Sequence, residues 1–125
     1  MALKHEELSG RVLQAAIEVH RQLGPGLLET AYQQCLAYEF TLAKIPFKKE
    51  VGLPVEYKGI KLDCGYRLDF FVDERLIVEL KTVDQFQKIH NAQLLTYMKL
   101  ANVSVGLLIN FNVDVLKQGI KRLVL

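Results

Sequence analysis

The sequence has few cysteines, no long apolar run and almost no excess charge, and each shortage excludes a class of protein. Its 125 residues include only Cys35 and Cys64, which are too few and too far apart for a disulfide scaffold or a zinc knuckle. No stretch approaches the roughly 18 consecutive apolar residues that a membrane span requires. The 16 basic and 14 acidic residues give a net charge of +2, which excludes a histone-like binder that relies on bulk charge.

The composition is that of an ordinary folded domain. Half of the residues are apolar, and no repeat, low-complexity tract or linker interrupts the chain, so we expect one domain over residues 1–125. His5, Glu6 and Glu7 stand where a signal peptide needs an apolar core, so we do not expect secretion. With two reduced cysteines and no membrane span, the expected location is the cytoplasm.

Changes in the period of apolar residues predict the order of helices and strands. We expect helices at 7–23, 28–44 and 86–101, and strands at 47–57, 60–72, 76–82, 103–110 and 120–125, the last after a short turn or helix from 115. Pro54 interrupts the first strand, and the almost wholly apolar 103–110 suits a central strand covered on both faces. The order α-α-β-β-β-α-β, with a further strand, predicts an α/β fold with a mixed sheet and flanking helices.

Two acidic residues face each other on the hairpin of 60–72 and 76–82. If residues 73–75 form the loop, Asp69 lies opposite Glu79, with Arg67 and Lys81 on the same face. The other face is apolar: Leu68, Phe70, Val72, Leu76, Val78 and Leu80. Because like charges about 5 Å apart destabilise a sheet, a divalent cation such as Mg²⁺ would explain the pair. Alternatively, Lys81 and Arg67 simply form ion pairs with the acids at a solvated face.

Two other groups of residues carry side chains that can form binding sites. His20 and His90 lack a partner at metal-ligand spacing, so we do not expect a zinc site, and His20 can interact with the dipole at the end of the first helix. Lysines cluster around the first hairpin, either as a solvated face or as a contact to a DNA backbone: Lys44, Lys48, Lys49, Lys58 and Lys61.

Short motifs in a consistent order resemble a known family. Asp69, followed on the next strand by Glu79-Leu80-Lys81, resembles the D…(D/E)xK motif of the PD-(D/E)XK nuclease superfamily, although Leu68 stands at the proline position. Gly26-Leu27-Leu28-Glu29-Thr30-Ala31-Tyr32 is similar to the string that defines the GxxExxY protein family. Gln93-Leu94-Leu95-Thr96-Tyr97 is similar to the Q-x-x-x-Y motif of RecB-type exonucleases. With the phrases at 20–29 and 107–111, the resemblance covers about residues 8–124.

The resemblance implies a restriction-endonuclease-like fold and a nuclease that uses Mg²⁺ or Mn²⁺ to hydrolyse phosphodiester bonds in nucleic acid, with DNA as the expected substrate. Asp69 and Glu79 would be metal ligands, the Leu80 carbonyl a third ligand, and Lys81 the catalytic lysine. Glu29 would be an additional catalytic acid near the metal. The substrate-binding residues implied are Gln93 and Tyr97, which are one helical turn apart, and Tyr32, which could instead be a packing residue that positions Glu29.

One alternative to the enzyme remains open. The chain could be a catalytically silent module that binds nucleic acid or protein and has kept the nuclease fold. In either case, 125 residues leave little room for a subdomain that grips DNA, so a homodimer or a protein partner could complete the binding groove.

Overall fold

The computed structural model describes residues 4–125, in which three α-helices pack on the two faces of a five-stranded sheet. Residues 1–3, the start of the segment in which we expect no signal peptide, lie outside this part. The elements are α1 (Glu6–Leu23), α2 (Glu29–Leu42), β1 (Phe47–Gly52), β2 (Val55–Tyr57), β3 (Ile60–Leu62), β4 (Arg67–Val72), β5 (Leu76–Lys81), α3 (Lys88–Ala101), β6 (Val105–Asn110), the 3-10 helix η1 (Leu116–Gly119) and β7 (Ile120–Val124). None of the described helices is long and apolar enough to cross a membrane.

The predicted fold class and element order are confirmed, with two corrections. The second helix ends at Leu42 rather than at 44, because Lys44 adopts a φ of 58° that a helix cannot contain. The single strand predicted over 60–72 is wrong, since residues 63–66 separate β3 from β4. There the Asp63 carboxylate accepts a hydrogen bond from the Gly65 N–H at 3.0 Å, and Gly65 has a φ of 78°. This local turn directs β3 out of the main sheet.

The strand order β1-β4-β5-β6-β7 places the two acid-bearing strands next to each other in the sheet. β5 and β6 are parallel and connected through α3, while the other neighbouring pairs are antiparallel, so the sheet is mixed as expected. The predicted hairpin register is confirmed where Phe71 pairs with Ile77 and Val72 with Leu76. Every residue of β6 is buried, which confirms the central, doubly covered strand that its composition predicted.

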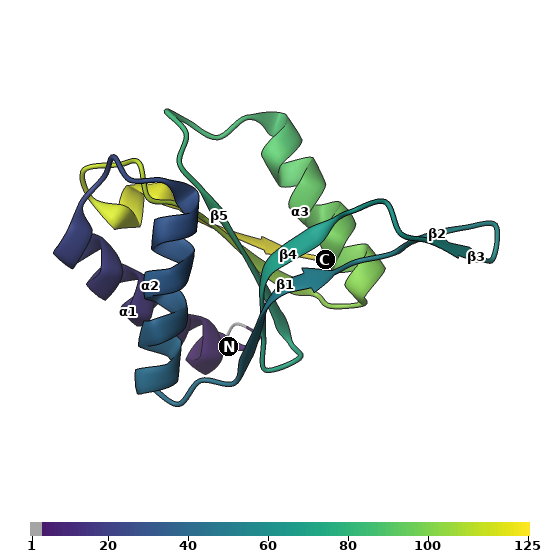
Figure 1. Cartoon of the computed structure of the whole chain (residues 1–125), viewed down its shortest axis with the longest axis horizontal. Coiled ribbons are helices and arrows are strands. Elements are labelled where there is room, and N and C mark those ends of the chain that lie inside the picture. The colour runs from purple at the N-terminus through teal and green to yellow at the C-terminus, as the bar shows by residue number, and fades with distance from the viewer. Residues whose placement is uncertain (1–3) are drawn as a thin grey trace.

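Two apolar cores lie on opposite faces of the sheet (Figure 1). Helices α1 and α2 cover one face, where Phe70 and Val78 are buried. Helix α3 covers the other face, where Met98 packs with Ile77. Leu68 was predicted to share a face with Phe70 but packs in the α3 core, because the pairing of β4 with both neighbouring strands is interrupted between these residues.

Strands β2 and β3 form a separate two-stranded hairpin, the arm (residues 55–62), which projects from the body of the molecule (Figure 1). Its register pairs Val55 with Leu62 and Tyr57 with Ile60, so these four apolar side chains share one face of the arm. Tyr57 is 57% exposed and Ile60 is 61% exposed. The arm therefore presents an apolar face to solvent.

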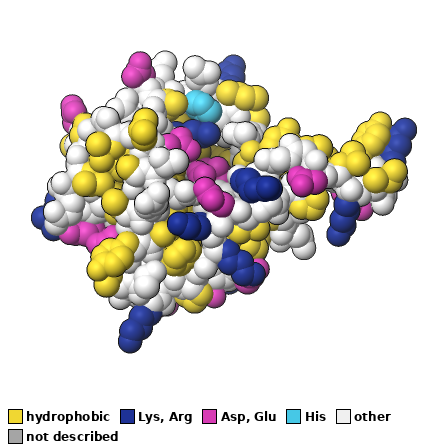
Figure 2. All heavy atoms as spheres, viewed as in Figure 1, with side chains coloured by type: hydrophobic (Ala, Val, Ile, Leu, Met, Phe, Trp, Pro, Cys, Tyr) yellow, Lys and Arg dark blue, Asp and Glu magenta, His cyan; other side chains and the backbone are white. Residues whose placement is uncertain are grey.

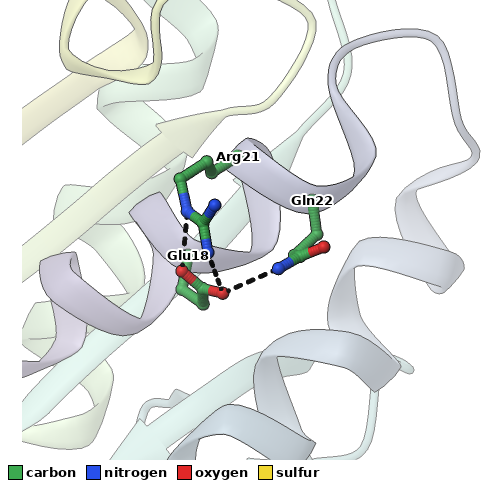
Figure 3. A network of polar contacts seen from close by, with 3 residues as sticks. All are labelled: Glu18, Arg21 and Gln22. Carbon is green, nitrogen blue, oxygen red and sulfur yellow. Dashed lines mark hydrogen bonds and ion pairs between the residues drawn. The ribbon is translucent and has the colours of Figure 1, made fainter.

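A network of exposed polar side chains occupies the last turn of α1 (Figure 3). The Arg21 guanidinium donates to both carboxylate oxygens of Glu18, at 3.0 and 2.8 Å, and Gln22 Nε2 donates to one of them at 3.0 Å. The hydrogen bond from Gln22, followed by that from Arg21, lowers the pKa of Glu18. Exposed pairs of this kind contribute little to stability. The helix ends because Gly24 follows with a φ of 67°, which glycine adopts without strain.

The close approach of η1 to the end of β6 predicts that Gly119 tolerates no side chain. A Cβ at Gly119 would lie 2.2 Å from the carbonyl oxygen of Asn110, so the backbone would have to shift. Gly119→Ala should therefore lower the free energy of unfolding by about 1–3 kcal/mol. As a control, a Cβ at Gly10 in α1 would meet nothing within 4 Å, and Gly10→Ala should raise stability by about 0.5–1 kcal/mol. Urea unfolding measures both; unchanged stability in Gly119→Ala would contradict this packing.

Candidate active site

The backbone pairing of β4 with β5 ends before Asp69. From there, two carboxylate side chains accept the hydrogen bonds between the strands. The ladder extends as far as the pair Phe70 and Val78. Beyond it, the Asp69 N–H donates to Glu79 Oε1 at 3.0 Å, and the Leu80 N–H donates to Asp69 Oδ2 at 2.8 Å. The predicted opposition of Asp69 and Glu79 is therefore realised through their side chains and not as a backbone pair. Each carboxyl group is fixed in orientation by an N–H of the neighbouring strand.

The pairing of β4 with its other neighbour, β1, is also interrupted at Asp69. In β1, Glu50 has a φ of 53°, and it falls between two residues that still pair with β4, Lys49 and Val51. Positive φ is strained for a residue with a Cβ, so the irregular backbone at this point is a specific feature of the fold. Asp69 thus lies where β4 is free of regular pairing on both sides, and its side chain can turn toward Glu79.

Glu79 is buried, Asp69 is half-buried, and the pKa of each acid is raised. Glu79 is only 6% exposed. Burial, and then the charge of Asp69, raise the pKa of Glu79 to about 9. Burial also raises the pKa of Asp69, although the hydrogen bonds from Leu80 and Glu79 oppose this shift. At neutral pH the pair therefore avoids the repulsion of two ionised carboxylates by keeping a proton on Glu79.

Ion pairs with basic side chains do not explain why Asp69 and Glu79 lie so close together. Among residues 4–125, neither Lys81 nor Arg67 forms an ion pair with Asp69 or Glu79. Lys81 is half-buried, and its charge lowers the pKa of both acids as a smaller effect than burial. The alternative of a solvated face neutralised by surface cations is therefore wrong for this structure. Figure 2 shows acidic side chains gathered in the middle of one face, between the positions of α2 and β4 in Figure 1, with basic side chains around them.

Glu29 lies within electrostatic reach of this pair from a different element. It is the first residue of α2 and is half-buried. Burial is the largest cause of its raised pKa, the charge of Asp69 is the second, and Lys81 acts in the opposite direction. The structure therefore brings Glu29, Asp69 and Lys81 to one region, although they come from α2, β4 and β5.

Asp69 and Glu79 have the chemistry that a divalent cation requires. A cation can replace the proton that Glu79 keeps at neutral pH, and the N–H donors hold both carboxyl groups in place as outer-shell partners do. Among the described residues, no three side chains of His, Cys, Asp or Glu form a metal-binding group. An ion at the pair would therefore complete its shell with waters and backbone oxygens, a ligand set typical of Mg²⁺. The residues present fit such an ion.

The motif on α3 reaches the same region from the opposite face of the sheet. Gln93 Nε2 donates to the Tyr97 hydroxyl at 2.9 Å, as the spacing of one helical turn allows. Tyr97 is 6% exposed, and its pKa is raised first by burial and then by the charge of Glu79. Tyr97 thus lies within electrostatic reach of Glu79, and Gln93 is hydrogen-bonded to Tyr97.

Tyr32 holds the loop that precedes Glu29. Its hydroxyl donates to the Gly24 carbonyl at 2.5 Å and accepts from the Leu27 N–H at 3.2 Å. Its ring stacks on Phe111 with centroids 4.4 Å apart. Because Tyr32 has no exposed surface, the assignment as a substrate-binding residue is not consistent with its position. Of the two roles that the sequence left open, these contacts suit the one that positions Glu29.

Two buried amides support the site and were not identified from the sequence. Gln33 Nε2, one turn after Glu29 on α2, donates to the Asp69 carbonyl at 3.4 Å. Asn110 accepts from the Val83 N–H at 3.1 Å and donates to the Val83 carbonyl at 2.7 Å, which fixes the segment that follows Lys81. Two features of the sequence could have indicated these residues. Gln33 is spaced one helical turn from Glu29, and Asn110 is the single amide at the end of the apolar run 103–110.

Both candidate histidines and two of the clustered lysines have partners within the protein. His20 Nε2 is hydrogen-bonded to the Val113 carbonyl at 2.7 Å, and His90 forms a capping box with Gln87 at the start of α3. Both cysteines are free. Of the clustered lysines, Lys48 pairs with Glu74 at 2.6 Å, and Lys58 lies 5.4 Å from the centre of the Tyr57 ring.

The raised pKa of Glu79 predicts how stability depends on pH in the presence of a chelator. Between the unfolded value of 4.5 and the folded value of about 9, the folded protein binds more protons than the unfolded chain. The free energy of unfolding should therefore fall as the pH rises through this window. Glu79→Gln should flatten the slope and be neutral or mildly stabilising at pH 8, because the amide needs no proton.

Urea unfolding between pH 5 and 9 in EDTA tests this dependence. Glu56→Gln, on the exposed arm, is the matched control and should keep the wild-type slope. A wild-type stability that is flat or rises with pH would contradict the raised pKa of Glu79. A loss of several kcal/mol in Glu79→Gln would instead show that Glu79 is needed as a carboxyl group in the hydrogen-bond network.

Comparison with known proteins identifies the family of the chain. The family model described as the PD-(D/E)XK nuclease superfamily matches residues 6–123. Searches of curated proteins and of solved structures found no match. The matched segment includes β4, β5, α2 and α3, which carry the predicted metal-binding, catalytic and substrate-binding residues. The chain belongs to the PD-(D/E)XK nuclease superfamily.

Proposed function

We propose that the chain, as a single nuclease domain of the GxxExxY type, is a divalent-metal-dependent enzyme that hydrolyses phosphodiester bonds in DNA. The observation that carries this proposal is the carboxyl pair of Asp69 and the buried Glu79, which is oriented by backbone N–H groups. Within residues 4–125, no cationic side chain forms an ion pair with either acid. Membership of the superfamily supports it, because PD-(D/E)XK nucleases generally use divalent metal ions. The proposed ions are Mg²⁺ or Mn²⁺.

In this proposal, Asp69 and Glu79 hold the ion, and the Leu80 carbonyl is a third ligand. When bound, the ion supplies positive charge that polarises a phosphate group. Glu79 gives up its proton on binding, so the affinity for the ion should rise with pH. The N–H groups of Asp69 and Leu80 keep the two carboxylates oriented while the proton is exchanged for the ion.

Lys81 and Glu29 act on the substrate and on the attacking water. Because Lys81 is half-buried and is not paired with the acids, its ammonium is free to stabilise negative charge that develops on a phosphate oxygen. Glu29 approaches from α2 and can orient the water by accepting a hydrogen bond from it. Gln93 and Tyr97 carry an amide and a hydroxyl on the α3 side, where they can donate to a phosphate.

Binding of the ion should be visible as a change in thermal stability. Mn²⁺ at about 100 times its Kd should stabilise the folded protein by about 2.7 kcal/mol, which raises the Tm by several degrees. Asp69→Asn should remove the rise, because one ligand and the charge that favours the ion are lost. Asp63→Asn, in the loop before β4, is the matched acidic control and should keep it. Differential scanning fluorimetry measures the shift. An equal rise in Asp69→Asn would overturn the assignment of the ligand.

Lys81 distinguishes the enzyme from a catalytically silent module. If the ammonium acts mainly in the transition state, Lys81→Ala should lower kcat by about 100- to 1000-fold with a much smaller change in affinity. Lys49→Ala, an exposed lysine on β1, should leave kcat unchanged and at most weaken binding with a salt slope reduced by about one.

The measurement combines cleavage of saturating DNA with binding at several salt concentrations. A Lys81→Ala variant that loses affinity but keeps the cleavage rate would contradict the catalytic role. If the wild type cleaves no substrate with either metal, the chain is the binding module and not the nuclease.

A further inference from the structure

A cavity of about 470 Å³ opens between the start of the arm and α3. Val55 and Tyr66 contribute from the arm and from the segment that leads back to β4. Ile89, Gln93, Tyr97 and Leu100 contribute from α3. Its volume lies within the range of roughly 300–1,000 Å³ that small-molecule sites occupy. The roles proposed above use Gln93 and Tyr97 but leave the cavity itself without a function.

The lining of the cavity is suited to a flat aromatic group. The rings of Tyr66 and Tyr97 lie 5.9 Å apart at an angle of 59°, and the aliphatic side chains of Val55 and Leu100 complete the wall. Tyr66 is 43% exposed, so one aromatic ring remains accessible to a ligand. Thr96 adds a hydroxyl to the same lining, which can hydrogen-bond the edge of a heterocycle.

The cavity adjoins the candidate active site through both tyrosines. Tyr66 immediately precedes β4 and stands three residues before Asp69. Tyr97 is close enough to Glu79 for the charge of that acid to contribute to its raised pKa, after burial. Tyr97 also packs in the same core as Leu68, the residue before Asp69. The cavity and the carboxyl pair are therefore connected through Tyr97, which lines the cavity and packs beside the strand that carries Asp69.

Basic side chains follow the cavity-lining residues along the chain, and their charge suits a phosphate backbone. Arg67 follows Tyr66 directly, and Lys58 and Lys61 lie on the arm that continues from Val55. All three are exposed, and none takes part in an ion pair within the part of the chain that the structure describes. Tyr57, with Lys58 5.4 Å from its ring centre, extends the aromatic and basic surface along the arm. This combination is the one by which single-stranded nucleic acids are bound.

We propose that this cavity binds one unpaired base of a single-stranded nucleic acid and thereby places an adjoining phosphate at Asp69 and Glu79, a substrate class that rests on the proposed function. A base in a duplex is stacked and paired, so it can enter the cavity only after it has been extruded from the helix. The burial of Glu79 adds a second constraint, since a phosphate has to come very close to the protein to reach this side chain. Both constraints favour a flexible single strand over a rigid duplex.

The test is binding without cleavage, measured by fluorescence anisotropy on the Asp69→Asn protein in EDTA. Three probes of about 12 nucleotides, near the footprint of single-strand binding sites, are compared: a labelled oligothymidine, a duplex, and an abasic strand with the same phosphates. Tyr66→Ala removes the exposed ring, Tyr66→Phe retains it, and Tyr38→Ala on α2 is the matched control, since Tyr38 is 65% exposed outside the cavity. Circular dichroism checks that each variant is folded.

The single strand should bind at least about tenfold more tightly than the duplex or the abasic strand. Tyr66→Ala should weaken the single-strand complex by about 5- to 140-fold, the loss expected for one base–aromatic stack. Tyr66→Phe and Tyr38→Ala should bind as the parent protein does. The comparison of base-containing and abasic strands needs no variant, so it decides the question even if Tyr66→Ala does not fold.

Equal affinity for the three probes, or unchanged affinity in a folded Tyr66→Ala variant, would overturn the base site. The same holds if Tyr66→Ala dissociates an oligomer and leaves oligonucleotide binding unchanged, because the cavity would then be covered by a second copy of the chain. These outcomes are independent of the proposed function. Metal-dependent cleavage without base-dependent binding would leave a nuclease that lacks this subsite, and base-dependent binding without cleavage would leave the subsite on a protein that is not a nuclease.

Discussion

The break in the pairing of β4 at Asp69 is the constraint on which the rest of the site depends. A regular antiparallel ladder would have used the N–H groups of Asp69 and Leu80 for backbone partners, and the side chains at positions 69 and 79 would have had no fixed donors. Here these donors are bound by the two carboxyl groups. The sheet therefore orients two acids at the point where it opens, in an environment so poorly solvated that Glu79 keeps a proton until something replaces it.

The elements around this break hold it in place from several directions. Gln33 reaches the Asp69 carbonyl from α2, and Tyr32 secures the loop that leads into the same helix. On the far side, Asn110 fixes the chain just beyond Lys81 with two hydrogen bonds to Val83. Because buried polar groups are costly when they lose a partner, these contacts favour one arrangement of the acids. The site is thus preorganised by residues that lie outside its motif.

Much of the fold could be predicted from the sequence, because periodicity reports local structure directly. The two helices around Gly24-Pro25-Gly26, the hairpin register at Phe71 and Val72 and the buried strand 103–110 all follow from patterns within single elements. The turn at Asp63 and Gly65 was missed, since it depends on one side-chain hydrogen bond within an apparently continuous strand pattern. The position of Leu68 was missed for a related reason: strict alternation of side chains fails where the strand loses its regular pairing.

The sequence predicts which two acids of the candidate site lie together, but it does not predict the residues that surround them. The placement of Asp69 beside Glu79 follows from counting residues around the hairpin. The burial of Glu79 does not, because it requires helices to pack on both faces of the sheet, α3 on one and α1 and α2 on the other. Gln33 and Asn110 act over 36 and 27 positions in the sequence, and an isolated amide gives no local pattern from which such a contact could be inferred.

The central claim is that the carboxyl pair of Asp69 and Glu79 exchanges the proton that Glu79 keeps at neutral pH for a divalent cation. A crystal structure of the protein grown with Mn²⁺ tests this most directly, because the anomalous signal of manganese locates the ion without reference to any model of the reaction. The account predicts an anomalous peak at ligand distance from one carboxylate oxygen of each acid, with the N–H bonds from Asp69 and Leu80 retained. A peak at another place, or a carboxyl pair that remains hydrogen-bonded to itself at saturating Mn²⁺, would contradict it.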